Sequence, residues 1–286
     1  MMLGVVGGSG LYALDGLQEA RWEAVTTPWG PPSDALLRGR LGSVELAFLP
    51  RHARGHRLLP HQLNHRANIA ALKSAGVTHL LAVSACGSLR EQLPPGTFVM
   101  PDQFIDRTHG RASTFFDGGV LAHIGFADPV SAVLGDLVEA AVRAVGGTVH
   151  RGGTYVAIDG PRFSTRAESR MLRALGGDII GMTGMPEAAL AREAELPLAM
   201  LAMVTDYDAW RDGEAAVDTA GVLAVLAANA ARARAVVAEV ARRLPHCPPC
   251  EPWITRALDT AILTPREAWP EAERARLATI APRLFR

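Results

Sequence analysis

The sequence predicts an α/β fold, a single domain in which helices flank a central mixed, largely parallel β-sheet. Short apolar runs rich in Val, Leu and Ile alternate along the chain with longer Ala-rich stretches of helical period. Strands of this composition, separated by helices, are typical of a parallel sheet that is covered on both faces. A chain of 286 residues, 49% of them hydrophobic, is long enough to bury such a core.

Short apolar runs that end at a turn or a polar residue predict the strands. In chain order they are 3–7, 44–50, 78–84, 97–100, 154–158 and 198–204. The stretches of helical period predict helices at 61–75, 129–145, 165–175, 186–194 and 217–243. Pro60 precedes the first helix, Ser164 is the expected N-cap of the third, and the last helix ends near Pro245.

After Pro245 the chain passes through a Pro-rich turn into two shorter helical patterns, at 252–262 and 266–278. A segment of this size cannot form a hydrophobic core of its own. We therefore expect one domain, 1–245, and a C-terminal helical extension, 246–286, that packs on this domain or on a neighbouring subunit.

Charge and hydropathy argue against several kinds of partner. The chain carries 29 basic and 29 acidic residues, which gives a formal net charge of zero, and it has no charged tail. This balance gives no electrostatic reason to expect nucleic acid or an anionic membrane as a partner. The first residues do not have the pattern of a signal peptide, and no apolar run is long enough to cross a bilayer. We expect a cytoplasmic protein.

Three cysteines, Cys86, Cys247 and Cys250, are too few for a disulfide scaffold. We interpret Cys86, at the end of a strand, as a small buried hydrophobic residue. Cys247 and Cys250 have the spacing of half a zinc site, with His246 beside them, or of a redox pair. Because structural zinc needs four ligands and the chain has no second cysteine pair, we expect no metal and two reduced thiols.

Polar residues follow the predicted strands, which indicates a ligand site beyond one edge of the sheet. They are Ser9, Arg51, His52, Ser84, Asp206 and Asp208. The backbone at 7–10 can form an anion nest or a simple tight turn, but its glycines do not fit the dinucleotide-binding fingerprint. Arg51 can grip a tetrahedral oxyanion through paired donors, and His52 can add another, unless this segment is a solvated loop.

Asp206 and Asp208 directly follow the apolar run at 198–204, a position that favours a functional role, although either residue can instead cap a helix. An apolar strand end and a second carboxylate both raise a carboxyl pKa. Because a protonated carboxyl group can act as a general acid, Asp206 and Asp208 are the candidate catalytic residues. Phe163 can stack on a planar base, and Thr183 offers a hydroxyl at the N-terminus of a predicted helix.

Seven segments between residue 4 and about 210 resemble the trimeric purine nucleoside phosphorylases, in particular the branch that cleaves 5′-methylthioadenosine. They are GVVGGSGL, RHARGHRLLPHQLNHRANIAALKSAG, SACGSLRE, PDQFIDRT, IDGPRFSTRAESRML, GMTGMPEAALARE and TDYDAW. The resemblance implies a pentosyltransferase of purine and methionine salvage, in which phosphate attacks C1′ to give adenine and 5-methylthioribose 1-phosphate. It also implies phosphate as co-substrate without a metal or organic cofactor, and a homotrimer or a dimer of trimers with sites at subunit interfaces.

The resemblance also assigns roles to single residues. The phosphate-binding positions are Ser9, Arg51, His52, Ser84, Ala85 and Thr183. Met182 is expected against the ribose, Phe163 and Ser164 beside the base, and Asp206 and Asp208 at the N7 and N6 edge of adenine. The pocket for the 5′-substituent is expected to be lined by His123 of a neighbouring subunit, Thr219 and Val222.

Other functions remain open at this point. S-methyl-5′-thioinosine or a 6-oxopurine nucleoside is the alternative substrate, because the segment at 181–193 also resembles a bacterial branch that cleaves methylthioinosine, although that branch lacks the paired aspartates. A nucleosidase would not need the phosphate residues. A dehydrogenase would need the dinucleotide fingerprint that the chain lacks. A purine-binding protein without activity would have no use for a protonated Asp206.

Overall fold

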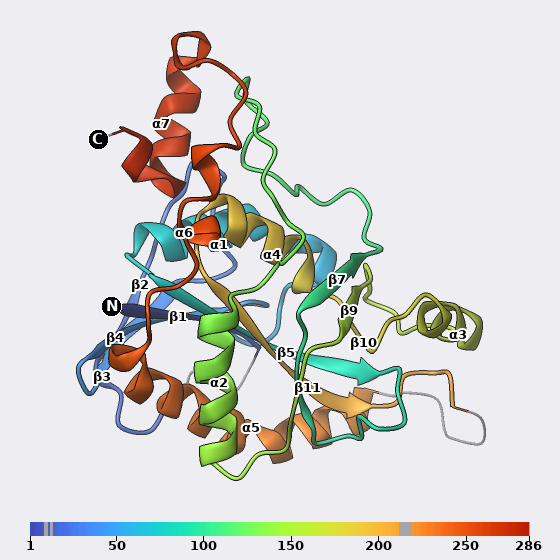
Figure 1. The fold of residues 1–286 in the computed structure, drawn as a ribbon. Coiled ribbons are helices and arrows are strands. Elements are labelled where there is room, and N and C mark those ends of the chain that lie inside the picture. Colours follow the sequence, from blue (N-terminus) through green and yellow to red (C-terminus); the bar gives the residue numbers. More distant parts are fainter. Residues whose placement is uncertain (9–10, 12–13, 212–218, 286) are drawn as a thin grey trace.

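The computed structural model describes residues 1–8, 11, 14–211 and 219–285, and the strands of this part of the chain form one sheet (Figure 1). The strands are β1 (Met2–Gly7), β2 (Gln18–Glu23), β3 (Leu36–Leu41), β4 (Val44–Pro50), β5 (His79–Ser88), β6 (Phe98–Met100), β7 (Gln103–Asp106), β8 (Val149–Arg151), β9 (Thr154–Ala157), β10 (Ile179–Gly181) and β11 (Leu198–Asp206).

The sheet is mixed and largely parallel, as the sequence predicts. Its main path runs β2-β3-β4-β1-β5-β10-β9-β7, while β11 pairs with β5 and β6, and β6 pairs with β8. Strands β1, β4, β5 and β11 are parallel neighbours, so their carboxyl ends lie at the same edge. The antiparallel pairs are β2 with β3, β3 with β4, β10 with β5, and β11 with β6.

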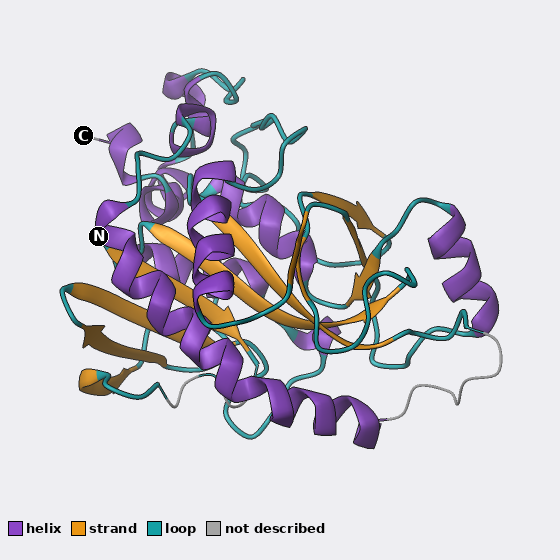
Figure 2. Cartoon of the chain, turned by 60° about the horizontal axis from the view of Figure 1, so that its bottom comes forward, coloured by secondary structure: helices purple, strands orange, loops and turns teal. Residues whose placement is uncertain are grey.

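Helices cover both faces of this sheet (Figure 2). The longer ones are α1 (His65–Ser74), α2 (Ala132–Ala144), α3 (Arg166–Ala174), α4 (Gly184–Glu193), α5 (Thr219–Arg243) and α7 (Glu271–Ile280). Apolar residues of α1 and α4 join one core cluster, and those of α2 and α5 join the other. Along β5, Leu80 and Ala82 belong to the first cluster and Leu81 and Val83 to the second, which explains why the strand is apolar at each position from Leu80 to Val83.

All six expected strands are present, but β2, β3, β7, β8 and β10 were not expected. Two expectations for the helices were wrong. The N-cap of α3 is Thr165, whose hydroxyl accepts from Glu168 N while the Glu168 side chain accepts from Thr165 N, so Ser164 precedes the cap. The pattern at 252–262 forms only the short helix α6 (Pro252–Thr255) and a 3₁₀ turn at Ala257–Asp259. Residues 217 and 218 of the last expected helix lie outside the described residues.

The C-terminal extension packs on the main body of its own chain. Leu277, Ile280 and Leu284 share the core cluster that contains α1 and α4. Glu195, directly after α4, accepts a hydrogen bond from Leu258 N and forms an ion pair with Arg283. In Figure 1 the extension lies beside the segment between β7 and α2, to which it is bridged at residues 122 and 262. The expected domain boundary at 245 stays a prediction.

Among the residues that the structure describes, no helix combines the length and the apolar character that crossing a membrane requires.

Candidate functional site

The carboxyl ends of β1 and β4 bring the first site residues together. Gly7 and Pro50 are paired at the ends of these two parallel strands, and Arg51 N donates to Gly7 O at 2.9 Å. Arg51 therefore lies directly beside Gly7, while Ser9 is outside the described residues. The neighbouring strand β5 places Ser84 at the same edge of the sheet.

The Arg51 side chain is buried and most of its donors are already bonded. Nε and Nη2 donate to the two carboxylate oxygens of Glu187 at 3.0 and 2.9 Å, Nη1 donates to Val83 O, and Nη2 also donates to Val6 O. A guanidinium has five N–H donors, so one donor, on Nη1, is left over. The paired donors that the sequence assigned to an oxyanion thus face Glu187, a residue that the sequence analysis did not single out.

His52 follows Arg51 and is held in one orientation. Its Nδ1 lies 2.9 Å from Leu58 O, and its ring stacks on that of His56 with centroids 4.5 Å apart. Burial, together with the neighbouring Arg51 and His56, lowers the pKa of His52 to about 4. The imidazole is therefore neutral at pH 7. Since a carbonyl can only accept, Nδ1 carries the proton and Nε2 offers an acceptor in place of the expected donor.

Ser84 and Thr183 bring two hydroxyl groups to the same place from segments far apart in the sequence. Ser84 Oγ lies 3.3 Å from Thr183 Oγ1 and donates to the carbonyl oxygen of Ala85 at 3.0 Å. Thr183 is the N-cap of α4, and its hydroxyl makes no capping hydrogen bond. Its own N–H donates to the hydroxyl of the buried Tyr155. A hydroxyl at a helix N-terminus that is not used for capping suits an anionic ligand.

His65, on α1, is a further buried residue that the sequence analysis did not find. Within the described part of the chain, neither of its ring nitrogens has a hydrogen-bond partner. Burial, and then the positive charges of Arg111 and Arg51, lower its pKa to about 3. A buried neutral imidazole next to Arg51 adds polar atoms to this side of the site. Only its position in space reveals it, because the sequence places it inside an ordinary helix.

Asp206 and Asp208 lie together at the end of β11. One Asp206 oxygen accepts from Thr205 Oγ1 at 2.7 Å, and the other accepts from the backbone N–H of Asp208 at 2.8 Å. Burial raises the pKa of Asp206, and the charge of Asp208 acts in the same direction. These are the two causes that the sequence predicts. Asp208 is buried at a positive φ of 49°, and its Oδ2 has no partner among the described residues.

The segment expected beside the nucleoside also forms one group. A Cβ added to Gly160, which has a φ of 66°, would lie 2.4 Å from Met182 Sδ. The turn at 160–162 therefore packs directly against the Met182 side chain. Phe163, next in the chain, is 38% exposed, and the buried hydroxyl of Ser164 has no partner within the described residues. Arg111 donates to the carbonyl oxygens of Met182 and Met185, both at 2.8 Å, and so fixes this turn.

Among the described residues, His123 is not joined to this group. His123 is exposed, and its backbone N–H donates to Ala261 O in the C-terminal extension. Thr219 and Val222 lie in the first turn of α5, but their side chains are outside the description.

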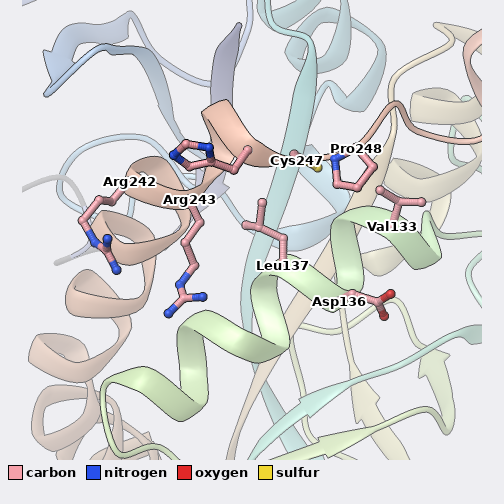
Figure 3. Close-up of a pocket in the computed structure, with 8 residues that line it drawn as sticks. Val133, Asp136, Leu137, Arg242, Arg243, Cys247 and Pro248 are labelled. Carbon is pink, nitrogen blue, oxygen red and sulfur yellow. The ribbon is translucent and has the colours of Figure 1, made fainter.

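A cavity of about 540 Å³ opens elsewhere, between α2 and the end of α5 (Figure 3). Its lining contains none of the residues that the sequence assigned to the site; it consists of Val133, Asp136, Leu137, Arg242, Arg243, His246, Cys247 and Pro248. The cavity is thus separate from the aspartate pair.

Comparison with known proteins is consistent with this geometry. The sequence model of the phosphorylase superfamily matches residues 2–242. The S-methyl-5′-thioadenosine phosphorylase of Geobacter sulfurreducens is 54% identical over 225 residues, which are 78% of this chain and 79% of that protein. The enzyme of the same name from Bradyrhizobium diazoefficiens is 49% identical over 286 residues, covering 100% of this chain and 98% of its own.

Solved structures agree with the sequence relatives. A methylthioadenosine phosphorylase from an Antarctic soil metagenomic library has a TM-score of 0.92 at 44% identity, covering 97% of this chain and 98% of that one. The methylthioadenosine phosphorylase of Schistosoma mansoni in complex with adenine has a TM-score of 0.83 at 35% identity, over 99% and 98% of the two chains. This chain therefore belongs to the phosphorylase superfamily and, within it, to the methylthioadenosine phosphorylases.

Proposed function

We propose that this enzyme cleaves 5′-methylthioadenosine with phosphate, giving adenine and 5-methylthioribose 1-phosphate. The observation that carries the proposal is the carboxyl pair of the half-buried Asp206 and the buried Asp208, in which the pKa of Asp206 is raised. It lies at the end of β11, the strand that pairs with β5 beside Ser84. The relatives named for this reaction, over the full length of the chain, point the same way.

The phosphate-binding residues stabilise the sugar, and the aspartate pair assists the departure of the base. As the glycosidic bond breaks, the sugar becomes cation-like and the purine leaves nearly as an anion. Phosphate beside C1′ stabilises the cation, and we assign its binding to Ser9, Arg51, His52, Ser84, Ala85 and Thr183. The neutral His52 accepts a hydrogen bond from a protonated phosphate oxygen through Nε2. Arg51, with its carboxylate partner, contributes one donor rather than a fork.

Asp206 acts on the leaving base. A carboxyl group with a raised pKa is protonated over a wider pH range, so it can donate to N7 as the bond breaks. General acid catalysis of this kind contributes roughly 10²–10⁴-fold. Asp208, with a buried oxygen that is free of partners among the described residues, accepts from the N6 amino group. Phe163 and Ser164 flank the base, and Met182 lies against the ribose.

We propose in addition that the active enzyme is a homotrimer in which His123 completes the pocket of a neighbouring subunit, together with Thr219 and Val222. The exposure of His123 within its own chain supports this assignment. The reaction needs no cofactor, since phosphate is the co-substrate and the acid and the acceptor are both side chains.

The experiment is a four-substrate assay of the purified enzyme, with and without phosphate. Methylthioadenosine, methylthioinosine, adenosine and inosine are compared, and the sugar product is identified by mass spectrometry. We expect cleavage of methylthioadenosine only with phosphate present, and a phosphorylated sugar product. Equal rates without phosphate would show a hydrolase and would contradict the proposal.

A further inference from the structure

Three potential metal ligands meet at the sheet edge opposite the aspartate pair. The ligand atoms of His79, Cys247 and Cys250 lie within 4.8 Å of one another. Each of the three residues is 8% exposed, so the cluster is buried. His79 is the first residue of β5, whereas the cysteines belong to the turn between α5 and α6. The cluster therefore joins two segments that are 168 positions or more apart in the chain (247 − 79 = 168).

This arrangement differs from the one considered from the sequence, in which His246 is the histidine beside the two cysteines. His246 is exposed and lines the neighbouring cavity, while the buried His79 faces the thiols. Two cysteines with two residues between them, plus a distant histidine, is a ligand set typical of zinc. Sequence spacing alone cannot supply His79, because its approach depends on the packing of α5 against the sheet.

The hydrogen bonds of His79 leave its Nε2 atom available to bind a metal ion. Its Nδ1 lies 2.9 Å from Thr78 Oγ1, and this hydroxyl donates to Met2 O. Because the hydroxyl proton is directed at Met2 O, the oxygen accepts from Nδ1–H, and Nε2 is left with a lone pair. A histidine whose other nitrogen donates to a fixed oxygen is the usual form of a metal-bound histidine.

A second set of contacts holds the cysteines. Cys250 lies beside Ser131, whose hydroxyl donates to Glu251 Oε2 at 2.7 Å. Glu251 Oε1 also accepts from Val133 N at the start of α2. The cavity shown in Figure 3 opens beside Cys247 and gives space for a fourth, exchangeable ligand. The three protein ligands, the oriented histidine and the adjoining cavity together match the layout of a zinc site with one open position.

We propose that His79, Cys247 and Cys250 bind one Zn²⁺ ion, with a water molecule from the cavity as the fourth ligand. Both thiols lose their protons to the solvent on binding, so that two thiolates and a neutral imidazole hold the ion. Zn–S bonds of about 2.3 Å and Zn–N bonds of about 2.0–2.1 Å require the three atoms to draw slightly closer together. Soft thiolate ligands favour zinc over magnesium or calcium.

The ion would have a structural role. Gly87, the β5 partner of Asp206, is eight positions along the strand from His79, a distance of roughly 26 Å at the usual rise per residue. The proposed site therefore lies far from the reacting atoms. It ties the end of α5 and the start of the C-terminal extension to the first residue of β5, so the ion adds stability without taking part in the chemistry.

The test begins with the full-length protein, purified under reducing conditions without chelators. We expect about one zinc per chain by elemental analysis. After the metal is removed and replaced by Co²⁺, we expect thiolate-to-cobalt charge-transfer absorption and the visible bands of tetrahedral cobalt. Removing zinc should lower Tm, and adding Zn²⁺ back should restore it. A reduced protein that holds no zinc and gives no thiolate–cobalt band would overturn the proposal, as would a Cys247–Cys250 disulfide in the freshly isolated enzyme.

Variants identify the ligands. H79Q, C247S and C250S should each hold less than about a tenth of the wild-type zinc and lose the rise in Tm on adding Zn²⁺. H246Q and C86S are the matched controls, one for a neighbouring exposed histidine and one for a buried cysteine elsewhere, and both should keep their zinc. Loss of zinc in H246Q with full retention in H79Q would overturn the assignment of His79. If a ligand variant does not fold, the zinc content and the cobalt spectrum of the wild-type protein still test the proposal.

Discussion

Arg51 and Glu187 form a two-point ion pair in the interior of the protein, with Nε–Oε1 and Nη2–Oε2 distances of 3.0 and 2.9 Å and only 2% of either side chain exposed. The pair joins the end of β4 to α4, the helix whose N-cap is Thr183. Glu187 therefore orients the guanidinium and compensates its charge in the absence of phosphate.

Removing one partner of this pair should be far more destabilising than replacing both. Removing one partner of a buried ion pair leaves an uncompensated charge, which typically costs about 3–5 kcal/mol. We expect E187A to lower the free energy of unfolding by about this amount, measured by urea denaturation. The double variant R51M/E187M should lose much less, because neither charge remains buried.

The control is R40A, which removes an ion pair to Glu19 on the surface, where the Arg40 side chain is 48% exposed. Its loss should cost less than about 1 kcal/mol. If E187A and R40A have the same stability, the buried pair does not have the role described here.

The sequence predicts the core strands well for a clear physical reason. β5 and β11 are buried on both faces, so they are apolar at nearly every position and stand out. β2 was missed because half of its residues, QEARWE, are charged and almost all of them are exposed. β8 was missed because its three residues, VHR, include only one apolar side chain, and β10, IIG, because two isoleucines are too short a run to show a period, whereas all three residues of β6 are apolar.

The site residues likewise include some that the sequence predicts and some that only the folded structure reveals. Asp206, and the direction in which its pKa is shifted, follow from the sequence because both causes of the shift are local: the apolar strand and Asp208. Glu187 was not found because its partner Arg51 is 136 positions away. The neutral state of His52 depends on Leu58 O and on burial, which are features of the folded loop rather than of the residue pattern.

Glu193, at the end of α4, should make stability depend on pH. Burial raises the pKa of this carboxyl to about 7, although Thr114 Oγ1 and Phe115 N donate to it. A group whose pKa is higher in the folded than in the unfolded protein stabilises the folded state. Its contribution is complete below the unfolded-state pKa, here 4.5, and is lost as the pH rises through the folded-state pKa of about 7. A shift of this size corresponds to about 3 kcal/mol.

E193Q should remove that dependence, because the amide does not titrate. We expect the difference in unfolding free energy between the wild type and E193Q to change by up to about 3 kcal/mol between pH 4.5 and pH 7.5. The wild type should become less stable relative to E193Q as the pH rises. Urea denaturation at a series of pH values measures this difference, in which other titrating groups cancel. A constant difference across the series would show that Glu193 ionises normally.

His123 should complete a neighbouring active site, so two inactive variants should complement each other. We expect H123A and D206N each to be impaired alone. If subunits mix at random in equal amounts, about a quarter of all sites, or roughly one of the three in each hybrid trimer, would combine an intact Asp206 with an intact His123. The measurement is activity after the two variants are unfolded and refolded together, with subunit exchange verified by native mass spectrometry. Activity that stays at the level of the separate variants, despite exchange, would place His123 outside the shared site.

The last prediction concerns the base and depends on Asp206 and Asp208. Adenine presents an amino donor at N6, whereas hypoxanthine presents an acceptor at the same position. The free oxygen of Asp208 is suited to the donor and would be left opposite an oxygen by a 6-oxopurine. A buried group without a partner costs roughly 1–3 kcal/mol, and more when it is charged. Sites that bond a polar group of the substrate can discriminate by about 10⁴-fold.

We therefore expect a strong preference for methylthioadenosine over methylthioinosine in kcat/KM. D208N offers both a donor and an acceptor, so it should reduce this preference. The amide of D206N can still donate a hydrogen bond to N7 but cannot transfer a proton to it, so this variant should lower kcat by about 10²–10⁴-fold. Because the protonated form of Asp206 is the active one and its pKa is raised, the wild-type rate should fall on the alkaline side, and D206N should lack that fall. Equal efficiency of the wild type with the two nucleosides would refute the role of Asp208 in recognising the amino group.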